Sequence, residues 1–288
     1  MATTVWKDEP SRARLEAWYQ QFLARVEGPV HSRHVPTRFG ESHVLVAGRA
    51  DGPVLVVLHP MRTGAAHLLA ELGPALAHFR VIAPDIPDQS VRGLQLRLPL
   101  ADDTLAQWLL DVLDALELPE VNLFGVSWGG FVARLTASTA PERVRRLALL
   151  VPAGIANGSH LTGLMKMAVP MIRYRLRPSE ANLRRVLDPL VTTWDPEWTG
   201  YIAATLNDMP FDARIPPLAS DEALRRLTMP VLVLGGGDDI SFPGEAVVRR
   251  MVSHVPTIEG EVLPIKHSPP TTDEFRAWLA ARLQRFMT

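Results

Sequence analysis

The serine within residues 125–130, which read Gly-Val-Ser-Trp-Gly-Gly, is the first candidate for chemistry in this sequence. The segment follows a short apolar run at 121–124 and precedes a helical pattern, so it marks a strand-to-helix turn. Glycines on both sides permit a turn sharp enough to push the Ser127 hydroxyl clear of the sheet. We therefore predict that Ser127 is a nucleophile of acyl transfer; the alternative is a glycine-rich turn with an unreactive serine.

A serine hydroxyl is a poor nucleophile at neutral pH, so the site needs a general base and an acid that orients this base. His267 follows a short strand-like segment, precedes the last helical pattern, and is the predicted base. A lone histidine is more often structural, so this prediction depends on its position downstream of the other candidates. The acid is expected on the loop after the apolar run 231–234, where Asp238 and Asp239 are adjacent. Only one of the two can serve, and their positions alone do not choose between them.

The composition argues against several other kinds of chemistry and partner. The formal net charge is −1 and the basic residues are spread along the chain, so we expect neither nucleic acid nor a membrane as a partner. A chain without cysteine has no disulfide, thiolate metal site or cysteine nucleophile, and we expect no metal or cofactor. There is no signal-peptide pattern and no apolar stretch of about 18 residues, so we expect a cytoplasmic protein. The oligomeric state stays open.

Short apolar runs alternate with helical patterns over most of the chain, which favours an α/β fold with a mostly parallel sheet. An opening hairpin is predicted at 30–37 and 42–47, preceded by an amphipathic helix at 11–26. The predicted buried strands are 54–58, 81–83, 121–124, 147–151 and 231–234. The predicted helices are 65–77, 104–116, 130–140, 244–252 and 273–286.

Residues 155–226 interrupt this alternation, because they contain helical patterns divided by prolines and no convincing strand. We interpret the segment as a helical insertion between two parts of a core at 1–154 and 227–288, with 1–28 as an N-terminal helical extension. Its methionines and aromatic residues either line an apolar pocket or pack the insertion onto the core. The candidates for substrate contact in this segment are Met165, Trp194 and Trp198.

In the order of its motifs the chain resembles the α/β-hydrolase superfamily from about residue 30 to the C-terminus, the insertion excepted. The segments that carry the resemblance are His-Pro after the strand at 54–58, the strand and acidic turn at 80–85, and the nucleophile elbow at 125–129. The family's Gly-x-x-Asp-x-x-x-Pro pattern maps onto Gly236, Asp239 and Pro243. The resemblance therefore implies Asp239 rather than Asp238 as the acid, and it implies that 155–226 is the family's cap.

The resemblance also implies an oxyanion hole made of the backbone amides of Trp128 and Met61. Pro60 stands where relatives usually have glycine, and proline has no amide hydrogen, but the expected donor is the following residue. His59 and Arg62 flank this loop and are further candidates for substrate contact. Arg62 is a candidate to bind an acidic group of a substrate, although an arginine on a loop is more often solvated or in a salt bridge.

A serine at position 127 disfavours the dehalogenases and epoxide hydrolases of this superfamily, which use an aspartate. The leading prediction is a carboxylesterase that cleaves small to medium acyl esters through an acyl-enzyme intermediate. A lactonase, thioesterase, perhydrolase or carbon-carbon bond hydrolase would use the same three residues. A non-catalytic ligand-binding protein is the alternative from a different class, because a fold does not fix function.

Overall fold

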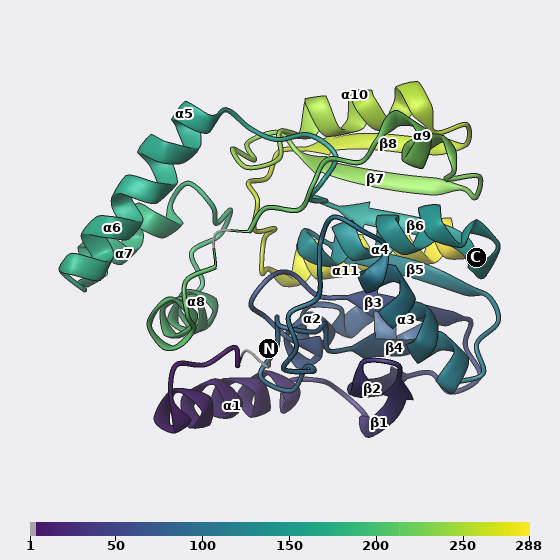
Figure 1. The fold of residues 1–288 in the computed structure, drawn as a ribbon, viewed down its shortest axis with the longest axis horizontal. Coiled ribbons are helices and arrows are strands. Elements are labelled where there is room, and N and C mark those ends of the chain that lie inside the picture. Colours follow the sequence, from purple (N-terminus) through teal and green to yellow (C-terminus); the bar gives the residue numbers. More distant parts are fainter. Residues whose placement is uncertain (1–3, 213) are drawn as a thin grey trace.

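An eight-stranded sheet forms the centre of the computed structural model, which describes residues 4–212 and 214–288 (Figure 1). Across the sheet the strand order is β1-β2-β4-β3-β5-β6-β7-β8. β2 pairs antiparallel with β1 and β4, and the remaining neighbours are parallel. This confirms the predicted mostly parallel sheet. The strands are β1 (His31–Thr37), β2 (Gly40–Gly48), β3 (Val54–Leu58), β4 (Arg80–Pro84), β5 (Val121–Val126), β6 (Val144–Leu150), β7 (Val231–Gly236) and β8 (Ile258–Leu263).

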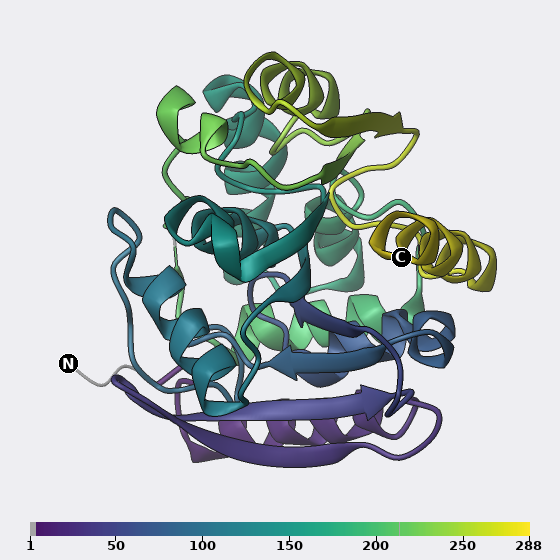
Figure 2. The same ribbon diagram turned by 90° about the vertical axis from the view of Figure 1, so that its right-hand side faces the viewer.

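Helices cover both faces of the sheet, as the quarter turn in Figure 2 shows. α3 (Thr104–Ala115), α4 (Trp128–Thr139) and α10 (Gly244–His254) lie on one face. α1 (Glu9–Leu23), α2 (Ala65–Glu71) and α11 (Asp273–Met287) lie on the other. Alternate residues of a strand contact opposite layers: Val56 and Leu58 pack in the first, Leu55 and Val57 in the second. The central strands are therefore apolar at successive positions, as the sequence predicted.

The predicted helix at 65–77 is interrupted in the structure. α2 ends at Glu71, and a 3₁₀ turn over Gly73–Ala77 follows it. Pro74 lacks an amide hydrogen and its ring crowds the preceding turn, so a continuous α-helix cannot pass through this position at low cost. The remaining predicted core helices are confirmed to within a few residues.

Four helices between β6 and β7 project from the carboxyl edge of the sheet, on the left in Figure 1. They are α5 (His160–Gly163), α6 (Val169–Leu176), α7 (Glu180–Leu187) and α8 (Pro196–Asp208), with a π-helical turn over Leu164–Ala168 joining the first two. α9 (Asp221–Arg225) follows and packs Leu224 into the core cluster beside α4 and α10. Within the described part of 155–226 there is no strand, as predicted. The division into core and cap stays a prediction.

α1 is packed between the core and α8. Asp8 caps its first turn by accepting a hydrogen bond from the Ser11 amide, at 2.8 Å. Tyr19 and Phe22 are fully buried against α2, and the ring of Trp18 lies 6.0 Å from that of Tyr201 on α8. The N-terminal helix thus supports the projecting helices as well as the sheet. Among the described helices, none has the length and apolar character that crossing a bilayer requires.

Candidate active site

Ser127 occupies a strained turn between β5 and α4. Its φ and ψ angles are 51° and −109°, a combination that residues with a side chain rarely adopt. The turn is tight because backbone approaches backbone on both sides. A Cβ atom on Gly125 would lie 2.4 Å from the Gly129 carbonyl oxygen, and one on Gly129 would lie 2.0 Å from that of Leu58. Both positions therefore require glycine, as the sequence suggested for the motif.

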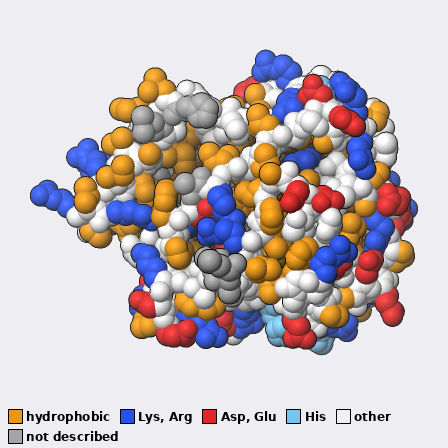
Figure 3. Space-filling model, viewed as in Figure 1, with side chains coloured by type: hydrophobic (Ala, Val, Ile, Leu, Met, Phe, Trp, Pro, Cys, Tyr) orange, Lys and Arg blue, Asp and Glu red, His pale blue; other side chains and the backbone are white. Residues whose placement is uncertain are grey.

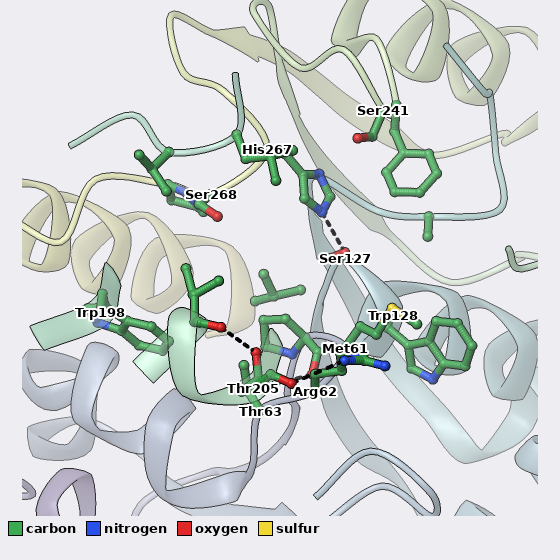
Figure 4. Close-up of a pocket in the computed structure, with 18 of the residues that line it drawn as sticks. Met61, Arg62, Thr63, Ser127, Trp128, Trp198, Thr205, Ser241, His267 and Ser268 are labelled. Atoms are coloured by element: carbon green, nitrogen blue, oxygen red, sulfur yellow. Dashed lines mark hydrogen bonds between the residues drawn. The ribbon is translucent and has the colours of Figure 1, made fainter. Parts of the chain in front are cut away.

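His267 and Asp239 complete a hydrogen-bonded chain with Ser127. The Ser127 Oγ lies 2.8 Å from His267 Nε2, and His267 Nδ1 lies 2.7 Å from Asp239 Oδ2. Figure 4 shows the imidazole directed at the serine hydroxyl. The other carboxylate oxygen, Asp239 Oδ1, accepts the backbone amides of Ser241 and Phe242 at 2.8 and 3.0 Å. The structure thus brings together the three residues that the sequence selected.

Of the two adjacent aspartates, only Asp239 is placed to contact the imidazole. Asp239 is buried and faces His267, whereas the side chain of Asp238 is exposed. Pairing of β7 with β8 places the two loops side by side, and the Asp238 amide donates to the Ile265 carbonyl at 3.1 Å. Asp239 and His267 therefore follow the carboxyl ends of the neighbouring strands β7 and β8, and Ser127 follows the same end of β5, on the other side of β6.

Met61 and Trp128 lie on the far side of the Ser127 hydroxyl from His267 (Figure 4). Trp128 is the first residue of α4, where backbone amides have no acceptor within the helix and the helix dipole favours negative charge. On the Met61 loop, Thr63 Oγ1 donates to the Pro60 carbonyl at 2.8 Å. Pro60 removes its own amide hydrogen and leaves that of Met61 in place. The arrangement is suited to hold a developing oxyanion beside the serine.

Arg62 connects this loop to the projecting helices. It has a positive φ of 58°, and its guanidinium donates to the carbonyls of Thr205, at 3.4 Å, and Pro210. Its own carbonyl accepts the Tyr201 hydroxyl at 2.5 Å. Burial lowers the pKa of Arg62, and the nearby Asp212 carboxylate opposes that effect. α8 thus contacts both the side chain and the main chain of Arg62, the residue that follows Met61.

A cavity of about 730 Å³ lies between the sheet edge and the projecting helices. Ser127 and His267 line its inner end, and Met167, Met171 and Ile202 contribute to the apolar outer wall. The volume falls in the range of small-molecule sites. Among the described residues, no group of three or more His, Asp and Glu side chains is arranged to hold a metal ion.

Of the five residues predicted to contact substrate, Arg62 and Trp198 line this cavity. The structure places the other three elsewhere. His59 is fully buried, with Nδ1 2.8 Å from the Pro60 carbonyl oxygen and Nε2 accepting the Ile86 amide at 2.9 Å; burial lowers its pKa. Met165 is 59% exposed on the outer face of its helical segment. The sequence did not reveal which residues of this segment face the cavity. Trp194 packs beneath the Arg184 guanidinium, 4.4 Å away, in a separate hydrophobic cluster.

Two buried polar residues near the site were not selected from the sequence as functional. Asp85 accepts the Tyr19 hydroxyl at 2.8 Å and the Ala65 amide at 2.9 Å, and its Oδ2 lies 2.6 Å from His43 Nδ1. Burial alone would raise its pKa, but the hydrogen bond with His43 and the neighbouring imidazoles lower the pKa to about 2. His67 lines the cavity, and burial lowers its pKa to about 3. Its ring nitrogens have no hydrogen-bond partner in the described structure. The Pro-Asp turn was a signal for Asp85; none pointed to His67.

Comparisons with known proteins find relatives of this chain in both sequence and structure. The family model described as α/β hydrolase fold matches residues 54–177. A Bacillus subtilis protein with the name uncharacterized carboxylesterase nap is 27% identical over 236 residues, which are 81% of this chain and 78% of that protein. A 2-hydroxy-6-oxo-2,4-heptadienoate hydrolase of Pseudomonas putida is 30% identical over 227 residues, 73% and 76% of the two chains. The crystal structure of naproxen esterase from Bacillus subtilis superposes with a TM-score of 0.80 at 25% identity, covering 96% and 98%.

Proposed function

Because this chain belongs to the α/β-hydrolase fold family, we propose that it is a serine hydrolase that cleaves carboxylic esters through an acyl-enzyme on Ser127. The observation that carries the proposal is the chain of hydrogen bonds from Ser127 through His267 to the buried Asp239. The ester as the substrate bond is supported by the Bacillus subtilis sequence match, named a carboxylesterase, and by the Bacillus subtilis structure, named a naproxen esterase.

In the acylation step, His267 Nε2 takes the proton of the Ser127 hydroxyl while Oγ bonds to the ester carbonyl carbon. The carbonyl oxygen becomes an oxyanion and accepts hydrogen bonds from the amides of Met61 and Trp128. Each such donor contributes about 2.7 to 4 kcal/mol of transition-state stabilisation. The imidazolium then gives its proton to the alkoxy oxygen, the carbon-oxygen bond breaks and the alcohol leaves. Water repeats the sequence on the acyl-enzyme and releases the acid.

Asp239 orients the base and stabilises its charge. Its Oδ2 accepts a hydrogen bond from the N–H at His267 Nδ1, so the neutral imidazole presents an unprotonated Nε2 to the serine. The amides of Ser241 and Phe242 hold the other carboxylate oxygen, which fixes the carboxylate plane. The edge of the Phe242 ring also packs against the imidazole, with the ring centroids 5.3 Å apart.

The cavity supports a small to medium acyl ester with an apolar body. Apolar side chains form much of its outer wall, and Trp198, Met171 and Leu206 are among them. Such side chains favour apolar ligands held by few polar contacts. The proposal includes a cytoplasmic location. It also includes no metal or organic cofactor, because the steps above need only the ester, water and groups of this chain.

A second candidate function is hydrolysis of a substrate that carries a carboxylate. Arg62 lines the cavity, and its guanidinium is bonded to main-chain carbonyls rather than to an acidic side chain of the described residues. The Pseudomonas putida relative is named as the hydrolase of a dienoate, which is a carboxylate. A higher kcat/KM for p-nitrophenyl hemisuccinate than for the butyrate ester, lost in Arg62→Gln, would establish this preference.

The primary test is the intact mass of the protein after incubation with a small fluorophosphonate, alongside hydrolysis of p-nitrophenyl acetate, butyrate and octanoate. Wild type should gain one phosphonyl group and turn over the esters, and Ser127→Ala should do neither. Ser241→Ala is the matched control, because Ser241 also lines the cavity but lies outside the hydrogen-bonded chain. Labelling that persists in Ser127→Ala, or an unlabelled wild type, would contradict the proposal.

A further inference from the structure

The projecting helices carry an apolar stripe that faces solvent. α5, the π-helical turn and α6 form one continuous helical segment from His160 to Leu176. Five hydrophobic side chains along it recur at intervals of four, four, three and four residues, and each is between 38% and 77% exposed. Buried contacts of α6 with α7 are made instead by Tyr174. The exposed stripe consists of Leu161, Met165, Val169, Ile172 and Leu176.

Basic side chains flank this stripe. Between residues 155 and 187 there are six lysines and arginines and one acidic residue, Glu180, although the whole chain has a net charge of −1. All six basic residues are exposed, and none forms an ion pair within the described part of the chain. Figure 3 shows hydrophobic and basic side chains side by side on this lobe, at the left. The basic residues are Lys166, Arg173, Arg175, Arg177, Arg184 and Arg185.

The stripe adjoins the mouth of the active-site cavity. Met167 and Met171, on the inner side of the same helical segment, line the cavity. The Arg175 guanidinium lies over the ring of Phe211, 4.8 Å from its centroid. Phe211 and Ile215 both line the cavity and are more than 60% exposed, so they form an apolar rim. One helical segment therefore presents an outer apolar face to solvent and an inner face to the substrate cavity.

We propose that this stripe and its basic flanks dock the protein on an anionic phospholipid surface. An exposed helix with an apolar face bordered by lysine and arginine is the pattern that lies in a bilayer interface. A second copy of the chain fits this surface poorly, because a two-fold contact would bring two basic patches against each other. A lipid headgroup layer matches both features, with acyl chains for the stripe and phosphates for the basic residues.

This inference goes beyond the proposed ester hydrolysis and reverses the expectation that no membrane is a partner. That expectation came from the near-neutral net charge and from basic residues that are spread along the sequence. The charge is in fact unevenly distributed, and only the folded chain shows which apolar residues of 155–187 stay exposed. Docking would bring the cavity rim to the lipid surface, where apolar esters partition.

Flotation with vesicles measures the docking directly, without reference to catalysis. We expect binding to vesicles of about equal phosphatidylglycerol and phosphatidylcholine, and little binding to phosphatidylcholine alone. Raising NaCl from about 50 to 500 mM should weaken binding strongly, because exposed charges are screened. The variant Ile172→Asp/Leu176→Asp should bind at least about tenfold more weakly, through the loss of apolar insertion. Val252→Asp on α10, a comparably exposed hydrophobic position away from the stripe, should bind as wild type does.

The double variant Arg173→Glu/Arg177→Glu tests the contribution of charge. Its control is Arg225→Glu/Arg249→Glu, which makes the same change in net charge at exposed positions outside residues 155–187. Each basic residue near an anionic surface contributes about fivefold in affinity, so the first pair should weaken binding at least about 25-fold and the control pair far less. All variants should hydrolyse dissolved p-nitrophenyl butyrate as wild type does, which shows that they are folded. The proposal would be overturned if the protein did not bind anionic vesicles or bound neutral vesicles equally well. It would also be overturned if either control variant lost as much binding as the variant it is compared with, or if the protein formed a dimer that Leu176→Asp dissociates.

Discussion

Replacing Asp239 by asparagine should leave the fold intact and reverse the protonation of His267. Asp239 Oδ1 accepts two backbone amides and Oδ2 faces His267 Nδ1 at 2.7 Å. An asparagine has a single oxygen, and keeping both backbone bonds places that oxygen at the Oδ1 position. Its NH₂ group then points at Nδ1, which has to accept, so the neutral imidazole carries its proton on Nε2. That nitrogen can no longer take the proton of Ser127.

The opposite amide orientation does not rescue the variant. It would direct NH₂ at the amides of Ser241 and Phe242 and leave two donors in a buried position without an acceptor, at about 1 to 3 kcal/mol each. The unproductive tautomer is therefore the stable one. In serine proteases the same substitution, with the same consequence, lowers kcat about 10⁴-fold. We expect a loss of that size here, which corresponds to about 5.4 kcal/mol in the activation barrier.

The assay is kcat for p-nitrophenyl butyrate in wild type, Asp239→Asn and Asp238→Asn, with circular dichroism to verify folding. Asp238 is the matched control, because it is adjacent, exposed and subject to the same change of charge. Its variant should keep nearly full activity. Retention of more than about a tenth of wild-type kcat in Asp239→Asn would refute the tautomer reasoning, and an equal loss in Asp238→Asn would refute the assignment of the acid.

Three further changes test other parts of the site. Tyr201→Phe removes a hydroxyl that donates to the main chain beside the oxyanion loop, so kcat should fall about tenfold with little change in KM, whereas Tyr174→Phe should change neither. Acid should destabilise the protein partly through Asp85: its folded pKa of about 2 lies below the ordinary 3.8, so the stability present above about pH 4 is lost as pH falls toward 2. Urea titrations should show a loss of about 2 kcal/mol in the free energy of unfolding over this pH range. Asp85→Asn should lack this part of the pH dependence, and a variant with the same pH dependence as wild type would contradict the role of Asp85. Met171→Trp should narrow the cavity and raise KM for the octanoate ester about tenfold relative to acetate, whereas Met165→Trp, on the exposed face, should leave the ratio unchanged.

Local sequence determined the elements and the chemical identity of the site. Continuous apolar runs predicted the buried strands, because parallel strands are covered on both faces and need no alternation. The glycines around Ser127 predicted the elbow, because only glycine tolerates the backbone contacts found there. The order of candidates along the chain indicated Ser127, His267 and one of two adjacent aspartates, since each follows a strand and the carboxyl ends of parallel strands meet at one edge.

Tertiary structure decided what these local signals leave open. The positions of Asp238 and Asp239 did not choose between them, and only the family resemblance implied Asp239. The pairing of β7 with β8 determines which carboxylate meets the imidazole. Among the methionines of the projecting helices, the packing of α6 on α7 sets the helical phase, which turns Met167 to the cavity and Met165 to solvent. The exposed apolar stripe could not be seen in the sequence, because the apolar residues of the insertion were expected either to line a pocket or to pack onto the core. Spacing along a chain specifies which side chains share a helix face, but only the position of the neighbouring elements decides whether that face is buried, lines a cavity or meets water.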